Sequence, residues 1–362
     1  MIHRMLRRTL VFLLPAILFA QPSREAPTKE KLQRIEQVVT TEMARTSIPG
    51  VSIAIARNGR VEWTQGFGMA DLENLIPVTA QTRIRLGSIS KPITAIAVMQ
   101  LVERGKIDID AEVQRYLPSF PKKPWPVTIR EILGHQSGIR HYKPDGSDSN
   151  NIKHYSDAIA PLEIFQNDPL LFEPGTKYSY STFGFNVLGA IVETVSGMKY
   201  TDYVRENIFK PAEMDQISQD DHFAIIPHRA RGYRLDNGVL HNCRFEDTSN
   251  KVAGGGFIST ATDLVKFAMA VNSGKLVKQD SARLMFTAQK LHDGSVSGYG
   301  MGFFIRQSDG HLSVSHSGGQ SGITTNLELF PAENIAIAVM TNLESARGLQ
   351  PMAQGIAKIA LE

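Results

Sequence analysis

The chain has 362 residues, of which 42% are hydrophobic, and its 39 lysines and arginines slightly outnumber its 36 aspartates and glutamates. Such a composition is ordinary for a globular protein with a sizeable core. Three of the arginines lie close to the N-terminus, so the rest of the chain is nearly neutral, which excludes nucleic acid and anionic surfaces as partners. Cys243 is the only cysteine, which excludes an intrachain disulfide and a cysteine-rich metal site.

Residues 1–20 have the pattern of a signal peptide. A basic start precedes the apolar run Leu10–Ala20, which is too short to span a membrane, and Ala20 is a suitable last residue before cleavage. We therefore expect a periplasmic or secreted protein without stable membrane insertion after cleavage, and a flexible leader over residues 21–29. An uncleaved N-terminal anchor is the alternative, because Leu18 is larger than the residue preferred at that position.

Helix-forming and strand-forming patterns follow one another along the chain. Apolar residues recur at helical spacing over 31–45, and the strand-like runs 51–56 and 61–67 flank Asn58-Gly59, a strong hairpin signal. From residue 92 to about residue 291 the pattern is mostly helical. The chain then returns to strands and closes with a helix, at 302–307, 312–316, 323–330, 335–341 and 345–361.

Strands at both ends of the chain predict a single sheet. The expected fold class is α+β: an antiparallel sheet of five or more strands is built from both chain ends, terminal helices flank it, and a mostly helical domain is inserted. Residues 30–91 and 292–362 are predicted to form the sheet domain, and residues 92–291 the helical domain.

A candidate catalytic pair lies where an apolar helix begins. In the run Leu86–Leu101, Ser88 and Lys91 are three residues apart, so they share one face of the first helical turn. Serine becomes a good nucleophile when a base takes its proton, and burial lowers the pKa of a lysine toward that role. The same spacing recurs at Ser119 and Ser196 without the buried helix. We therefore predict Ser88 as the nucleophile and Lys91 as the base.

Two further segments could complete this site. Tyr180 stands in a loop before a second apolar helix, and a tyrosine near a lysine can act as the phenolate half of a proton relay. The alternative for Tyr180 is an aromatic loop anchor. The small residues of His316-Ser317-Gly318-Gly319 would let an extended acyl substrate pair with a strand edge, and a sheet-corner turn is the alternative there.

Three motifs resemble those of the penicillin-recognising serine hydrolases: Ser88-x-x-Lys91, Tyr180-Ser181-Thr182 and His316-Ser317-Gly318. They are most similar to the motifs of the class C β-lactamase and D-alanyl-D-alanine carboxypeptidase group. The resemblance covers residues 30–345. Supporting segments that also match this group are Leu133–Ile139, Ala253–Phe257 and Tyr299–Phe303.

The resemblance implies a β-lactamase/transpeptidase-like fold and an acyl-enzyme on Ser88. It also implies that Lys91 and Tyr180 move the proton, while backbone N–H groups of Ser88 and of a residue near Gly319 stabilise the oxyanion. The substrate-binding residues that it implies are Thr182, His316, Ser317, Gly318 and Gly319.

Two positions depart from the family's pattern. Thr182 stands where the middle motif has asparagine, and His316 stands where the third motif has lysine. In both features the chain resembles the subgroup of mitochondrial serine β-lactamase-like proteins and their bacterial relatives. Because a histidine is charged only part of the time near neutral pH, we expect weak penicillin hydrolysis. A peptidase is the expected activity, and an esterase, a weak β-lactamase or a DD-carboxypeptidase is the alternative.

Neither a metal nor a cofactor is expected, because the ten histidines show no His-Glu-x-x-His or comparable spacing. The expected partners are a peptide or small-molecule substrate and other copies of the chain in a homo-oligomer. A catalytically silent scaffold that forms filaments or binds penicillin is the alternative of another class. The intact set of Ser88, Lys91 and Tyr180 argues against it.

Overall fold

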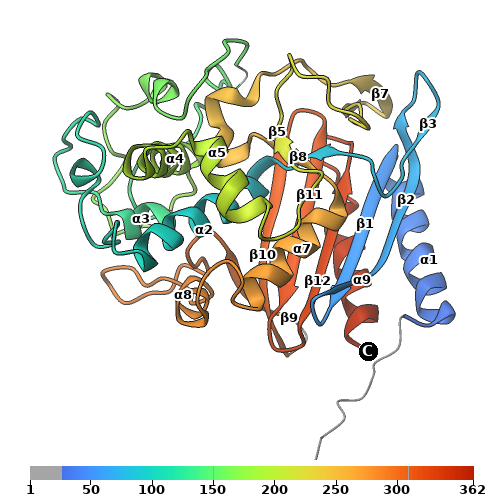
Figure 1. The fold of residues 1–362 in the computed structure, drawn as a ribbon. Helices are drawn as coiled ribbons and strands as arrows, with labels where there is room; N and C mark the ends of the chain where they lie inside the picture. The colour runs from blue at the N-terminus through green and yellow to red at the C-terminus, as the bar shows by residue number, and fades with distance from the viewer. Residues whose placement is uncertain (1–26, 150, 309) are drawn as a thin grey trace, which may run out of the picture.

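The computed structural model describes residues 27–149, 151–308 and 310–362 (Figure 1). The predicted signal peptide, and all of the predicted leader before Pro27, lie outside the described residues. Over the ranges that the structure covers, no helix is both long enough and apolar enough to cross a membrane.

The described part of the chain forms a seven-stranded antiparallel sheet from both chain ends, in the order β3-β2-β1-β12-β11-β10-β9. The expected α+β fold is thereby confirmed. The left-handed backbone of Asn58 and Gly59 (φ +51° and +79°) forms the predicted hairpin turn between β1 and β2. The strand bounds are β1 Gly50–Arg57, β2 Arg60–Asp71, β3 Ile76–Pro77, β9 Phe304–Ser308, β10 His311–Gln320, β11 Ile323–Phe330 and β12 Ile335–Thr341.

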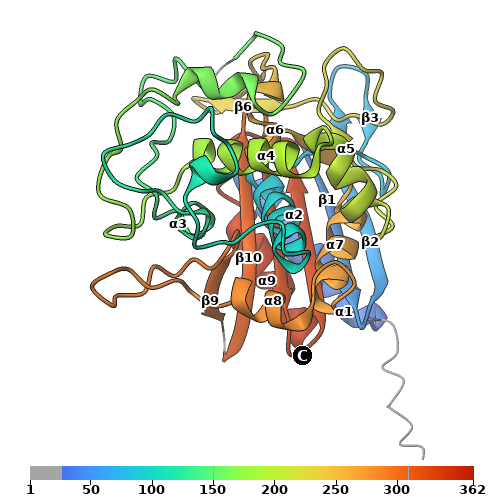
Figure 2. The same ribbon diagram turned by 60° about the vertical axis from the view of Figure 1, so that its left-hand side comes forward.

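Helices cover both faces of this sheet (Figures 1 and 2). The terminal helices α1 (Lys29–Thr46) and α9 (Leu349–Leu361) pack on each other, and α9 packs on β11 and β12. On the opposite face, α7 (Ala261–Asn272) packs against β1 and β12, although it lies within the predicted helical domain. The division into two domains stays a prediction.

The remaining helices lie mostly to one side of the sheet (Figure 1). Helix α2 (Ser90–Glu103) is buried on every side, as its apolar sequence predicts. Thr128 and Glu131 form the capping box of α3. The other bounds are α3 Ile129–Leu133, α4 Thr182–Ser196, α5 Tyr200–Val204, α6 Val252–Gly255, α8 Gln279–Met285, η1 Gly87–Ile89, η2 Val113–Arg115, η3 Ala160–Ile164, η4 Arg205–Phe209 and η5 Thr248–Lys251.

Five short strands lie outside the predicted pattern. Among the described residues they form a three-stranded sheet, β4-β8-β5, and a separate hairpin of β6 and β7. Strands of two to four residues are too short to show an alternation in sequence. The small sheet matters for function, because β4 leads directly into the turn that carries Ser88. The bounds are β4 Ile84–Arg85, β5 Ser218–Gln219, β6 Tyr233–Asp236, β7 Val239–Asn242 and β8 Phe257–Ser259.

Candidate active site

Ser88 lies in the 3₁₀ turn η1, immediately before α2. Two glycines let β10 approach this turn. Gly87 has a φ of +54°, and a Cβ on it would stand 2.9 Å from the backbone nitrogen of Gly319. A Cβ on Gly318 would stand 2.0 Å from the carbonyl oxygen of Leu86. The absence of side chains at both positions therefore brings the first and third motifs into backbone contact.

Lys91 is fully buried, and its Nζ lies 2.9 Å from Oγ of Ser88. The same nitrogen lies 3.1 Å from Oγ1 of Thr182 and 2.8 Å from the carbonyl oxygen of Gly254. Burial, and then the positive charge of Lys251, hold the pKa of the Lys91 amine well below its usual range. A neutral amine can donate its two N–H groups to Thr182 and Gly254, which leaves its lone pair for the proton of Ser88.

Tyr180 covers the amine of Lys91, with its ring centroid 4.8 Å from Nζ. Burial raises the pKa of the Tyr180 hydroxyl, and a hydrogen bond with the Ser88 hydroxyl only partly offsets that effect. The raised pKa favours a neutral phenol over the phenolate that the sequence suggested. We therefore predict Lys91 as the better base of the two and Tyr180 as a group that passes on a proton.

Two histidines for which the sequence predicted no individual role, His135 and His141, hold the start of α4. Nδ1 of His135 accepts a hydrogen bond from the backbone N–H of Ser181 (3.1 Å), and Nδ1 of His141 accepts one from Thr182 (3.1 Å). The ring of His135 also packs 4.3 Å from that of Tyr180, centroid to centroid. These contacts fix the loop that carries Tyr180. His135 lies in the segment Leu133–Ile139, whose resemblance to the family was the one sign in the sequence that this histidine belongs to the site.

His316 does not present a charge to substrate. It is buried, Nδ1 donates to the carbonyl oxygen of Ser317 (2.7 Å), and Nε2 accepts from the hydroxyl of Tyr299 (3.0 Å). Burial is the largest cause that lowers the pKa of His316 to about 3. The imidazole is therefore neutral at pH 7, instead of partly charged as the sequence suggested.

A cavity of about 420 Å³ opens beside Ser88. Of the predicted site residues, Ser88, Tyr180, Thr182 and Gly319 line it, whereas Lys91, His316, Ser317 and Gly318 do not. Lys91 contacts Ser88 from the buried side, and Ser317 is exposed on the same strand as Gly319. The structure therefore brings all three motifs together, and the individual roles of their residues stay predictions.

The cavity wall also contains three charged residues that no sequence motif predicted, Glu246, Lys251 and Glu344. Glu246 and Lys251 form a buried ion pair, and Oε2 of Glu246 has no hydrogen-bond partner within the described ranges. Nothing in the sequence marks this pair, because the two side chains meet only when the turn η5 forms and the packed chain buries them.

Acidification is expected to destabilise the fold through its buried neutral histidines. An unfolded histidine takes up a proton near pH 6.5, whereas burial lowers the pKa of His141 to about 4 and that of His316 to about 3. Stability is therefore fully present above the unfolded pKa and falls as the pH drops below it. Between pH 7 and pH 5 each such histidine should cost about 2 kcal/mol of unfolding free energy.

Denaturant unfolding at the two pH values measures this loss. The variant His316→Gln should lose less stability on acidification than the wild type, and exposed His241→Gln should lose the same amount as the wild type. An equal pH dependence in all three proteins would contradict a neutral His316.

The family described as Beta-lactamase matches residues 35–361. "Serine beta-lactamase-like protein LACTB, mitochondrial" of Homo sapiens is 33% identical over 294 residues, which are 62% of this chain and 54% of that protein. "Putative penicillin-binding protein PbpX" of Bacillus subtilis (strain 168) is 31% identical over 281 residues, with 77% and 68% of the two chains covered. The chain thus spans about half the length of the mitochondrial relatives.

Solved structures with the same fold include the octameric penicillin-binding protein homologue from Pyrococcus abyssi. It is 27% identical, with a TM-score of 0.79 over 91% of this chain and 77% of that one. The D-amino acid amidase from Ochrobactrum anthropi SV3, complexed with L-phenylalanine amide, also has a TM-score of 0.79, over 92% of this chain and 99% of the amidase. At 23% identity, the amidase shows the fold alone.

Proposed function

Because the chain belongs to the Beta-lactamase family, whose members are serine hydrolases, we propose that it is an exported peptidase that forms an acyl-enzyme on Ser88. One observation carries the proposal: the Ser88 hydroxyl lies 2.9 Å from a lysine amine that is fully buried. Within the described ranges this amine has no carboxylate partner that would hold its proton. The pair therefore has the arrangement of a nucleophile and its base.

The chemistry follows from this geometry. The proton of Ser88 moves to Nζ of Lys91 as Oγ forms a bond to the substrate carbonyl carbon. The backbone N–H groups of Ser88 and Gly319 would stabilise the oxyanion. When the tetrahedral intermediate collapses, the bond to the leaving amine breaks, and Lys91 returns the proton to that amine through the hydroxyl of Tyr180. Water then attacks the ester, which releases the acid and restores Ser88.

The open edge of β10 supports a peptide substrate. Strand β9 pairs with β10 only along His311–Ser315, so residues 316–320 have no partner strand on that side within the described ranges. Gly319 and Gln320 on this edge line the cavity beside Ser88. An extended peptide can add to such an edge through main-chain hydrogen bonds, with its carbonyl group near the nucleophile.

The charges around the cavity disfavour a β-lactam substrate. A penicillin carries a carboxylate, but His316 is neutral and Lys251 is already paired with Glu246. Glu344 adds negative charge to the same wall, while the Glu246–Lys251 pair has no net charge. A substrate with a free amino group or with no charge would fit this wall better than an anion.

Covalent labelling and a substrate panel test the proposal. The protein is treated with a fluorescent phosphonate and with a fluorescent penicillin, and the adducts are located by mass spectrometry. We expect phosphonate labelling at Ser88, and faster turnover of peptides and amino-acid amides than of nitrophenyl esters or penicillins. Labelling elsewhere would contradict the nucleophile, and turnover of esters alone would contradict the peptidase. No labelling and no turnover would favour a silent scaffold.

Export and assembly have separate tests. N-terminal sequencing of protein recovered from the periplasm or medium should begin at Gln21 if the signal is cleaved as expected. A full-length N-terminus in the membrane fraction would instead support the anchor. The octameric state of the Pyrococcus abyssi homologue makes a homo-oligomer a proposal for this chain, which light scattering of the mature protein tests.

A further inference from the structure

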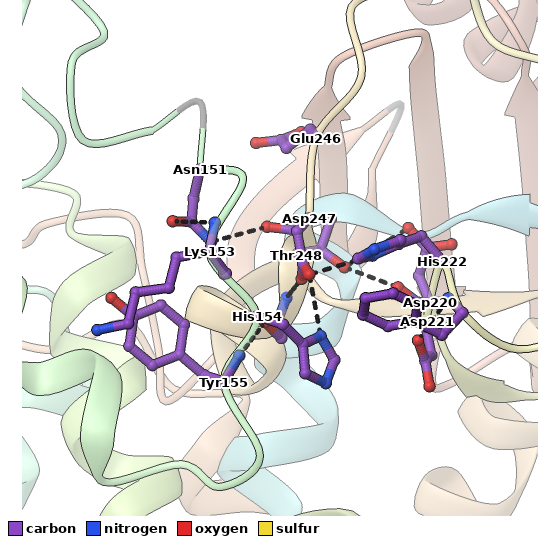
Figure 3. A network of polar contacts seen from close by, with 12 residues as sticks. Asn151, Lys153, His154, Tyr155, Asp220, Asp221, His222, Glu246, Asp247 and Thr248 are labelled. Carbon is purple, nitrogen blue, oxygen red and sulfur yellow. Dashed lines mark hydrogen bonds and ion pairs between the residues drawn. The ribbon is translucent and has the colours of Figure 1, made fainter.

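Two histidines and one aspartate from distant parts of the sequence meet outside the catalytic cavity (Figure 3). Nδ1 of His154 lies 2.9 Å from Oδ2 of Asp247, and Nδ1 of His222 lies 3.1 Å from the same oxygen. All three candidate ligand atoms lie within 4.8 Å of one another. No short sequence motif could have marked this cluster, because the second histidine lies 68 positions after the first and the aspartate 25 positions after the second.

The carboxylate of Asp247 is held in place by its neighbours. Its side chain is only 2% exposed, and Oδ1 accepts a hydrogen bond from the backbone N–H of Ser249 (2.8 Å). The backbone N–H of Asp247 donates to the carbonyl oxygen of Asn151, and that of Tyr155 donates to Oγ of Ser249, both at 2.8 Å. These bonds fix the segments around His154 and Asp247 to each other and leave Oδ2 facing the two imidazoles. A metal site needs such support for its ligands.

Nδ1 of His222 is buried and has no hydrogen-bond partner within the described ranges, although Oδ2 of Asp247 is 3.1 Å away. This contact therefore lacks the alignment of a hydrogen bond. A buried polar atom without a partner is costly, and a cation between the nitrogen and the carboxylate would satisfy both. Phe223 and Phe245 flank the ring, with centroids 3.9 and 5.1 Å away, so the imidazole is held on its sides.

We propose that His154, His222 and Asp247 bind a divalent metal ion of the zinc type through Nδ1, Nδ1 and Oδ2. Zinc bonds of about 2.0–2.2 Å in tetrahedral geometry place neighbouring ligand atoms roughly 3.3 Å apart, close to the two separations in the cluster. Two imidazoles favour zinc or a similar transition metal over magnesium or calcium, which prefer oxygen ligands. The fourth position would be taken by water, because the His154 side chain is 36% exposed.

The position of the site predicts what the metal would do. Asp247 lies between Glu246 and the turn η5, whose last residue is Lys251, and both of these charged residues line the catalytic cavity. A bound ion would tie the segments of His154 and His222 to this wall. The metal would therefore stabilise the wall without taking part in the reaction at Ser88.

Zinc binding by the full mature chain, without a polyhistidine tag, tests the site. After treatment with a chelator, the protein is dialysed against zinc chloride and the bound metal is quantified. We expect one zinc per chain, with affinity at least about tenfold lower in His154→Ala and in His222→Ala. The exposed His241→Ala is the matched control and should bind zinc as the wild type does. Equal binding by all four proteins, or no binding by the wild type, would overturn the proposal.

A second measurement separates loss of the site from misfolding. Asp247→Asn keeps the oxygen that caps η5 but removes the negative charge. Zinc should raise the Tm of the wild type and of His241→Ala, and leave the Tm of His222→Ala and Asp247→Asn unchanged. Cobalt in place of zinc should give the visible absorption of a tetrahedral site only in the first two proteins. A Tm increase by zinc of the same size in His222→Ala would count against the site.

Discussion

Replacing Ser88 with alanine is expected to lower kcat by about 10⁴-fold or more, because no other group can take its place as nucleophile. The loss should appear in kcat, since the rest of the cavity wall still binds substrate. Phosphonate labelling should disappear together with turnover. Steady-state kinetics on the best substrate of the panel, with labelling in parallel, measures both effects.

The chain supplies its own control for this substitution. Ser119 has the same spacing to a lysine, Lys122, but it is exposed in a loop, so Ser119→Ala should keep wild-type kcat and labelling. The fold of Ser88→Ala should survive, because Lys91 retains its contacts with Thr182 and Gly254. A Ser88→Ala protein that melts like the wild type and still turns over substrate would refute the acyl-enzyme at this residue.

Replacing Lys91 with methionine is expected to lower kcat by about 10²- to 10⁴-fold, the usual contribution of a general base. Methionine fills the buried space of the lysine stem but cannot accept the proton of Ser88. The variant should react more slowly with the phosphonate for the same reason. Thermal unfolding of the variant checks that the fold persists, and wild-type kcat in a folded Lys91→Met protein would assign the base elsewhere.

If Lys91 is the base, its protonation should determine how kcat/KM depends on pH. The base must be neutral, so activity should rise with pH through the pKa of Lys91, which burial and the charge of Lys251 hold well below 10.5. In Lys251→Met the repulsion is lost and Glu246 is left unpaired, and both changes raise the pKa of Lys91. The rise of kcat/KM on the acidic side of the pH profile, the acidic limb, should therefore move to higher pH.

The exposed Lys275→Met, which removes a lysine on the surface, is the matched variant for this shift. Its acidic limb should coincide with that of the wild type. A limb that stays in place in Lys251→Met would show that a group other than Lys91 titrates.

The sheet and its flanking helices could be predicted because their signals are local and long. Strands such as β11 and β12 span seven or eight residues, and α1 spans 18. Each is long enough for its apolar residues to show a helical spacing or a continuous run in the sequence. The two- and three-residue strands β4, β5 and β8 carry no such signal. Their pairing depends on what lies beside them, so the small sheet that leads to Ser88 was missed.

Sequence alone determined which residues could start the chemistry, since helix geometry places Ser88 and Lys91 on one turn whatever surrounds them. Only the tertiary structure decided their state and their partners. Packing of α4 and α6 around Lys91 removes water from its amine and lowers its pKa, and burial of the imidazole lowers the pKa of His316 to about 3, which makes that ring neutral at pH 7. Burial and long-range distances are properties of the packed chain, because they depend on segments that the sequence keeps far apart.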